Sequence, residues 1–251
     1  MQNNNSSITI VAENTCLMNN ILAQHWVSFW IKYYWKNYLF DCAQIFEWLE
    51  YNFKELNLNP EKLDWIIISH DHYDHVNTLP KFIEKYKTKK IYVPKDFKSL
   101  ENKNIIKVDN YLEIEKWFFL TWSMDWWNIK EQSAILDFGK KWIMIIVWCS
   151  HPGIINIVEN AIKITWNKKI MWIIWWLHLV ESSYEEIMNI VEYLKKIDIS
   201  FIIPGHCTWN DAVNILRKEL PDRIKTSLMW SIWAWNSIEF MPEIKFHIDE
   251  W

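Results

Sequence analysis

The feature that most constrains this chain is a short apolar run that ends in a cluster of metal-binding residue types. Residues 65–69 (WIIIS) have the length and apolar character of a buried strand, and His70-Asp71-His72-Tyr73-Asp74-His75 follows directly. Histidine and carboxylate ligands at this density suit Zn(II), Fe(II) or Mn(II). The alternative is a polar loop whose histidines are coincidental, but such a dense cluster rarely arises by chance. The sequence therefore predicts a metal-dependent enzyme.

The spacing within the cluster distributes its side chains over two metal positions. His70 and His72 stand at i and i+2 and point the same way if the segment is extended. Asp74 and His75 then turn toward a second position, so one loop can serve two ions. Asp71 lies between the ligands, where it either supports a ligand, accepts a proton or is simply a solvated loop carboxylate.

Three more histidines follow predicted strands in the same manner: His151, His178 and His206. Taken alone, each would more often be a core or surface histidine than a ligand. Strand ends of such folds gather at one edge, however, and functional sites form there. We therefore expect the three histidines to join the cluster after residue 69.

The order of predicted elements is mostly β early and βαβα later, without a linker or an internal repeat. The 251 residues suffice for one sizeable α/β domain, 1–251, and the pattern predicts two sheets packed face to face with helices outside. The predicted strands are 8–12, 27–33, 38–41, 65–69, 91–93, 105–108, 134–138, 143–148, 169–174 and 200–203; the predicted helices are 45–56, 79–86, 152–164, one opened by the capping box Ser183-x-x-Glu186, and 210–219.

Charge and hydropathy argue against several partners. The formal charge of −4 gives no electrostatic footprint for nucleic acid or an anionic membrane. The chain contains no uninterrupted apolar stretch of the ~18 residues that a membrane span needs, and its N-terminus lacks a signal-peptide pattern. The four cysteines show no C-x-x-C spacing. A cytoplasmic location is the default expectation.

The balance of tryptophan and glycine is abnormal. The chain has 20 Trp and 3 Gly, whereas average usage of ~7% would give roughly 18 glycines. Tryptophan stands where glycine is expected, as at Trp175-Trp176 after a strand and at Trp209 after a predicted turn, and it cannot replace glycine where φ is positive. We hypothesise that many of these codons are UGA, read as glycine in the source organism. The alternative is a protein that is truly rich in tryptophan.

The histidine motifs resemble the metallo-β-lactamase superfamily, whose pattern is H-x-H-x-D-H followed by isolated His, Asp and His ligands. The resemblance implies the four-layer αββα sandwich of that superfamily and two divalent metal ions, with Zn expected and Mn or Fe as alternatives. Asp41 resembles the early structural aspartate of the family. By this resemblance the first metal has the ligands His70, His72 and His151, and the second has Asp74, His75 and His206.

One departure from the superfamily pattern concerns the bridging aspartate. The only Asp between the third and last histidine motifs is Asp198, which precedes the wrong strand. His178 occupies that region instead. We predict that His178 is a metal ligand or a catalytic acid or base, alongside Asp74 as the other catalytic residue; the alternative is a histidine that only orients a ligand.

The resemblance narrows to one subfamily when Trp is read as Gly. Residues 148–154, 175–179 and 206–209 then become GCSHPGI, GGLHL and HCTG. These motifs are similar to the subfamily named for 7,8-dihydropterin-6-methyl-4-(β-D-ribofuranosyl)aminobenzene-5′-phosphate synthase, over about residues 25–206.

The resemblance implies a transferase that displaces pyrophosphate from a pterin diphosphate with help from metal ions. Two alternatives stay open: a metal-dependent hydrolase of phosphodiester, thioester or lactone substrates, and a di-iron redox protein. The expected partner is a small anionic molecule, a pterin diphosphate in the first case, rather than nucleic acid or membrane. The oligomeric state is open, with a homo-oligomer among the options.

Overall fold

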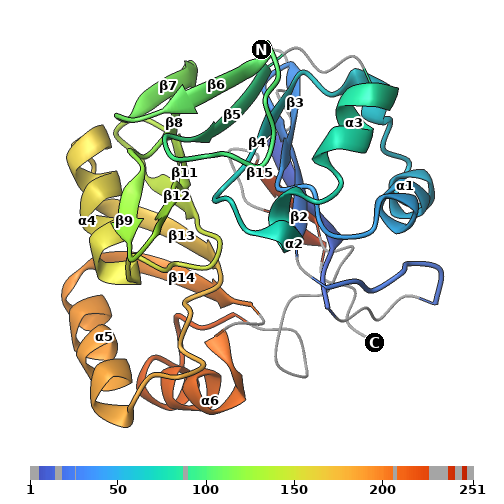
Figure 1. Cartoon of the computed structure of the whole chain (residues 1–251). Helices are drawn as coiled ribbons and strands as arrows, with labels where there is room; N and C mark the ends of the chain where they lie inside the picture. The colour runs from blue at the N-terminus through green and yellow to red at the C-terminus, as the bar shows by residue number, and fades with distance from the viewer. Residues whose placement is uncertain are drawn as a thin grey trace. The chain divides into compact units, whose positions relative to one another are not determined.

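The computed structural model describes residues 6–14, 19–25, 27–86, 90–205, 208–225, 237–240 and 245–247 (Figure 1). The chain forms two compact units: Met1–Lys107 with Trp233–Trp251 make the first unit, and Val108–Ile232 make the second. The single domain expected from the sequence stays a prediction. Among the described residues, no helix combines the length and apolar character that crossing a membrane needs.

The first unit is built on a mixed sheet of eight strands in the order β16-β15-β1-β2-β3-β4-β5-β6. Strands β1, β2 and β3 form an antiparallel meander, and β3, β4 and β5 run parallel. The elements are β1 (Ser6–Ala12), β2 (Ser28–Tyr33), β3 (Lys36–Phe40), α1 (Phe46–Glu55), η1 (Pro60–Lys62), β4 (Trp65–Ile67), α2 (Tyr73–Val76), α3 (Leu79–Lys85), β5 (Lys90–Pro94), β6 (Ile105–Val108), β15 (Ser237–Phe240) and β16 (Lys245–His247).

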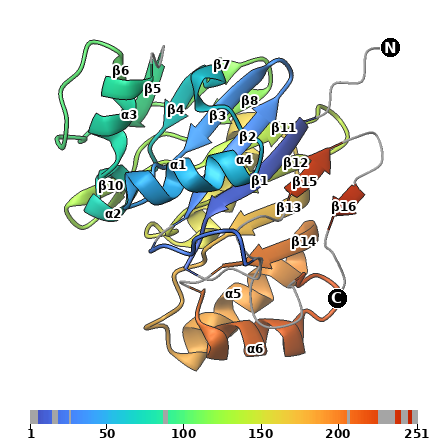
Figure 2. The same ribbon diagram turned by 90° about the vertical axis from the view of Figure 1, so that its right-hand side faces the viewer.

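Helices α1 and α3 supply the apolar side chains that cover this sheet. Leu49 and Phe53 of α1 and Phe82 of α3 are buried in one cluster with Ile66 of β4 and Ile91 of β5. Figure 2 shows α1 lying against the sheet of its own unit. All three residues of β4 are buried, which explains its continuous apolar sequence. The end of β4 is therefore a rigid base for the loop that carries the histidine cluster.

The second unit contains a six-stranded sheet in the order β14-β13-β12-β11-β8-β7 and a separate two-stranded ribbon, β9-β10. Strands β12, β13 and β14 run parallel, so their carboxyl ends share one edge. The elements are β7 (Leu112–Glu115), β8 (Phe118–Leu120), β9 (Met124–Trp126), β10 (Ile129–Glu131), β11 (Ala134–Asp137), β12 (Ile143–Ile146), α4 (Ile154–Thr165), β13 (Lys169–Trp175), α5 (Tyr184–Lys196), β14 (Asp198–Pro204) and α6 (Asn210–Glu219).

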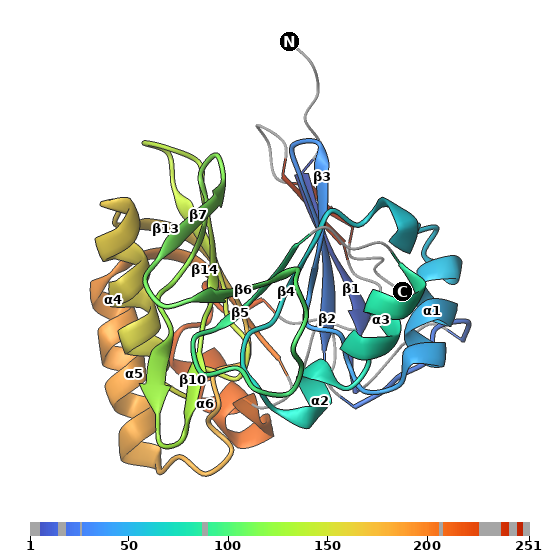
Figure 3. The same cartoon turned by 45° about the horizontal axis from the view of Figure 1, so that its top comes forward.

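Helices α4 and α5 pack on one face of this second sheet, as Figure 3 shows. The apolar side chains Ile187, Val191 and Leu194 lie on one face of α5 and are buried in the core of the unit. The predicted capping box is also present: the Ser183 hydroxyl accepts the Glu186 N–H, and the Glu186 carboxylate accepts the Ser183 N–H.

Two sequence expectations for the second unit are wrong in detail. Pro152 was expected in the first turn of a helix, but α4 begins at Ile154 because Gly153 has a φ of 86° and ends the preceding turn. The short strands β7 to β10 were not predicted. Each has only three or four residues, which is too short for the alternation of β7 or the apolar residues of β8 to distinguish a strand from a loop.

Candidate metal centre

In the first unit, one buried carboxylate holds the start of the loop that follows β4. Asp41, directly after β3, is fully buried. Its Oδ1 accepts the Ser69 N–H at 2.7 Å, and its Oδ2 accepts the Ser69 hydroxyl at 2.5 Å. The same Oδ2 lies 2.5 Å from Nδ1 of His75. Burial raises the pKa of the Asp41 carboxyl above its usual range, and hydrogen bonds from His75 and Ser69 oppose that rise.

These contacts select the nitrogen through which each histidine can bind a metal. His75 donates from Nδ1 to Asp41, so Nε2 is its ligand atom. Ser69 donates to Asp41 and therefore accepts at 2.9 Å from Nδ1 of His70, which makes Nε2 the ligand atom of His70 as well. One carboxylate thus sets two rings, in the way that hydrogen-bonding partners usually orient metal-binding histidines.

The candidate ligand atoms that follow β4 lie close to one another. Nε2 of His70 lies 2.9 Å from Nδ1 of His72, close to the roughly 3.3 Å that separates two nitrogens on a tetrahedral Zn(II) with ~2.0–2.1 Å bonds. Oδ2 of Asp74 lies 3.6 Å from Nε2 of His75. The rings of His70 and His75 also lie close together, with centroids 4.0 Å apart, so the division of the four side chains into two metal positions stays a prediction.

Asp71 has a structural role that the sequence left open. Its Oδ2 accepts the backbone N–H groups of Lys98 and Ser99 at 2.7 and 3.1 Å. It therefore fastens the histidine loop to the segment that follows β5, and the reading as a solvated loop carboxylate is wrong.

We expect Asp71→Ala to lower the free energy of unfolding by about 1–2 kcal/mol, because two backbone donors lose a carboxylate acceptor. Denaturant unfolding measures this loss. Tyr73→Ala is the matched control, since Tyr73 is only two residues further along, at the start of α2, and its side chain is exposed. Equal stability of the two variants would contradict the role given to Asp71.

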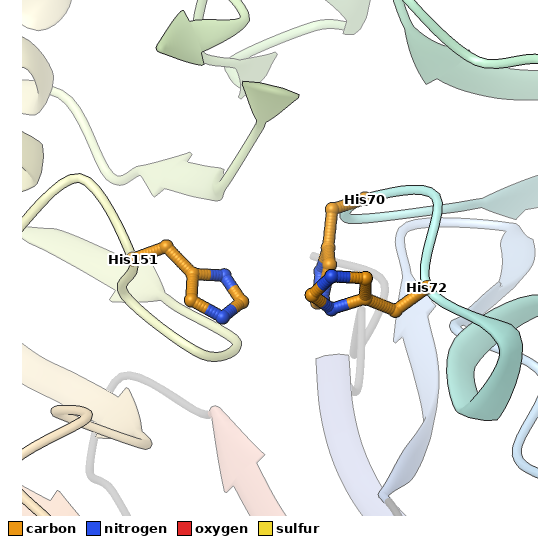
Figure 4. Close-up of side chains that lie close together, drawn as sticks. All are labelled: His70, His72 and His151. Carbon is orange, nitrogen blue, oxygen red and sulfur yellow. The ribbon is translucent and has the colours of Figure 1, made fainter. Parts of the chain in front are cut away.

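In the second unit, His151 lies in the loop after β12 and is held by Glu131, the last residue of β10. Nδ1 of His151 is 2.9 Å from Oε2 of the fully buried Glu131. This contact joins residues twenty positions apart and was not predicted from the sequence. Figure 4 shows the side chains of His70 and His72, from the loop after β4, and of His151, from the loop after β12.

His178 lies beside His151, after the end of β13, and the ring centroids of the two histidines are 4.6 Å apart. It has a φ of 48°, a strained conformation for a residue with a side chain. Its Nδ1 is buried and has no hydrogen-bond partner among the described residues. An unpaired buried nitrogen next to His151, itself a candidate metal ligand, marks His178 as a functional candidate. His206 and Cys207 lie outside the described residues, and Cys149 is buried.

Known proteins share the fold and part of the sequence pattern of this chain. Residues 39–120 match the model of the metallo-β-lactamase superfamily. The structure aligns with Tm1679, described as a metal-dependent hydrolase of the β-lactamase superfamily, with a TM-score of 0.73 at 21% identity over 94% of this chain and 99% of that one. YhfI of Bacillus subtilis, a metallo-β-lactamase fold protein, aligns with a TM-score of 0.64 at 12% identity over 94% of this chain and 100% of its own. These structural similarities confirm the predicted fold class, that of the metallo-β-lactamase fold.

A more particular similarity is to a synthase. The chain is 25% identical to the 7,8-dihydropterin-6-methyl-4-(β-D-ribofuranosyl)-aminobenzene-5′-phosphate synthase of Methanocaldococcus jannaschii, over 87% of this chain and 92% of that protein. It is also 28% identical to the uncharacterized protein MJ0448 of the same organism, over 83% of this chain and 93% of that protein.

Proposed function

We propose that this chain is a dinuclear metal enzyme of the dihydropterin and ribofuranosylaminobenzene-phosphate synthase type. The observation that carries the metal site is the Asp41–Ser69 arrangement, which directs Nε2 of both His70 and His75 for ligation. The similarity to the Methanocaldococcus jannaschii synthase supports the reaction type. The substrate would be a small anionic molecule, a pterin diphosphate.

The donors present fit divalent metal ions. Imidazole nitrogens with a carboxylate oxygen suit Zn(II), with Mn(II) and Fe(II) as alternatives. When bound, two such ions would supply positive charge that stabilises an anionic leaving group. In the proposal the first ion is held by His70, His72 and His151, and the second by Asp74, His75 and His206.

The proposed reaction replaces one bond by another at the pterin methylene carbon. The bond from this carbon to a pyrophosphate oxygen breaks, and a bond to the aminobenzene nucleophile forms. The nucleophile loses a proton in this step, and a base must take it. We assign that role to the Nδ1 atom of His178, which is buried without a partner next to His151. Asp74 is the other proposed catalytic side chain.

The His178→Ala variant separates the two roles left open for this residue. As a base, His178 contributes ~10²–10⁴-fold to the rate, so the variant should lose that factor in kcat and keep the metal content of the wild type. Elemental analysis and steady-state kinetics of the same preparation measure both quantities. A loss of one metal ion per chain would instead make His178 a ligand, and unchanged kcat with unchanged metal would contradict both roles.

A hydrolase is the second candidate, because the structurally similar Tm1679 is described as a metal-dependent hydrolase. The discriminating experiment incubates the metal-loaded protein with a hydroxymethyldihydropterin diphosphate and the aminobenzene ribose phosphate, and in parallel with an activated phosphodiester. The synthase proposal predicts coupled product and pyrophosphate in equal amounts. Phosphodiester cleavage without coupling would replace it by the hydrolase, and iron as the native metal would favour a di-iron redox protein.

A further inference from the structure

The two carboxylate oxygens of Glu131 make three hydrogen-bond contacts with the loop after β12. Oε1 accepts the Ser150 N–H at 2.9 Å, and Oε2 accepts the His151 N–H at 3.0 Å. Oε2 also lies 2.9 Å from Nδ1 of His151. The Glu131 side chain is fully buried. A buried carboxylate needs several donors to offset its desolvation, and here one short loop provides all three.

The chemistry of these contacts fixes the tautomer of His151. An ionised carboxylate is an acceptor only, so Nδ1 of His151 must donate and Nε2 carries the lone pair. The two backbone contacts act on the same loop. They hold Ser150 at a φ of 59°, a conformation that costs free energy in a residue with a side chain. Glu131 therefore controls both the course of the loop and the orientation of the ring.

We propose that Glu131 is the positioning residue that presents Nε2 of His151 for metal binding. The proposal rests on the proposed metal site, because His151 is one of its ligands. Its function is analogous to that of Asp41 in the first unit: each unit places one buried carboxylate behind its own ligand histidines.

Glu131→Gln is the sharpest variant for this role. Glutamine keeps the size of the side chain, but its NH₂ group would face an N–H donor, so at least one of the three contacts must break. Removing such a partner typically weakens metal binding by ~10–100-fold. Chelator competition should show a loss of that size for Zn(II), and the absorption spectrum of the Co(II) form should change.

Ile135→Val is the matched control, because Ile135 is a buried residue of β11 in the same unit. We expect this variant to lose some thermal stability and to keep the Zn(II) affinity and Co(II) spectrum of the wild type. An unchanged affinity and spectrum in Glu131→Gln would overturn the positioning role. So would an equal loss of affinity in both variants, because that would reflect general destabilisation.

A second measurement needs neither a variant nor a metal. Long-range ¹H–¹⁵N correlation of the metal-free wild type in mildly alkaline buffer reports which ring nitrogen of His151 carries the proton. The proposal predicts the Nδ1–H tautomer, and an Nε2–H tautomer would overturn it. The proposed function and the positioning role of Glu131 can be contradicted separately. A wild-type protein that binds no metal would contradict the proposed function, but it would not change the tautomer measured for His151.

The backbone supports a second, independent inference. Ten residues other than glycine have a positive φ in the described part of the chain, and four of them are tryptophan: Trp117, Trp127, Trp166 and Trp209. A bulky side chain at positive φ is a true outlier in proteins. Four such outliers of one residue type point to a systematic cause.

The individual positions are those that glycine normally occupies. Trp166 has φ 57° and ψ 17° at the C-cap of α4, the left-handed conformation in which glycine commonly ends helices. Trp209 has φ 60° and ψ 150°, a region that is essentially restricted to glycine. Their side chains are 89% and 51% exposed, so burial of the indole does not offset the strain.

We infer that glycine stands at these four positions in the protein as its source makes it, because the codons are read there as glycine. Peptide mass analysis of the protein from its source should find the residue mass of glycine at 166 and 209. Finding tryptophan at both would overturn the inference.

The inference also predicts how substitutions change the Tm of the protein that carries tryptophan at these positions. Trp166→Gly and Trp209→Gly should each raise Tm by ~2–4 °C, the shift that 1 kcal/mol produces in a chain of this size. Trp48→Gly is the control, because Trp48 lies inside α1 with an exposed side chain, where glycine disfavours the helix. Its Tm should fall. A fall in all three variants would contradict the inference.

Discussion

Asp41→Asn is expected to lower the free energy of unfolding by about 3 kcal/mol or more and to weaken metal binding on the loop after β4. The wild-type carboxylate accepts from the Ser69 N–H, the Ser69 hydroxyl and Nδ1 of His75, and all of these groups are buried. An amide accepts at one end only, so buried donors lose their partner at the other end. Breaking one member of a buried charged network typically costs ~3–5 kcal/mol.

This effect is a large share of the ~5–15 kcal/mol that stabilises a typical domain. Denaturant unfolding of the metal-free protein measures it, and chelator competition measures the metal affinity. Asp64→Asn is the control: Asp64 also accepts a backbone N–H through its carboxylate, from Asn37, but it is only partly buried and lies at the other end of β4. Wild-type stability and affinity in Asp41→Asn would contradict the proposed role of Asp41.

His75→Ala is expected to lose one metal ion per chain and to reduce kcat by ~10²–10⁴-fold. The factor follows because a metal ion contributes several kcal/mol to transition-state stabilisation, and ~1.4 kcal/mol corresponds to tenfold in rate. His25→Ala is the control, since His25 is an exposed histidine of the same unit to which we assign no metal role. A His75→Ala variant with full activity and two metal ions would contradict the site.

The part of the candidate site that directly follows β4 could be predicted from the sequence, because its residues are consecutive in the chain. A buried strand and six consecutive residues bring His70, His72, Asp74 and His75 together, and the structure confirms β4 but places Asp74 and His75 in the short helix α2. The paired strands β11 and β12, the capping box of α5 and the bounds of α6 were also predicted, since each depends on residues that are close in sequence.

The supporting contacts could not be predicted, because they join distant residues. Asp41 meets His75 across 34 positions, and Glu131 meets His151 across 20 positions. A sequence shows an acidic residue after or before a strand but not which ring it will face. The role of Asp71 depends in the same way on the chain returning to Lys98 and Ser99.

The central claim is that this chain holds two metal ions, and the metal content of the purified protein tests it most directly. The protein is expressed, dialysed against metal-free buffer and subjected to elemental analysis against an accurate protein concentration. We predict close to two equivalents of Zn(II), or of Mn(II) or Fe(II), per chain. A content well below one equivalent, unchanged after incubation with Zn(II), would contradict the account.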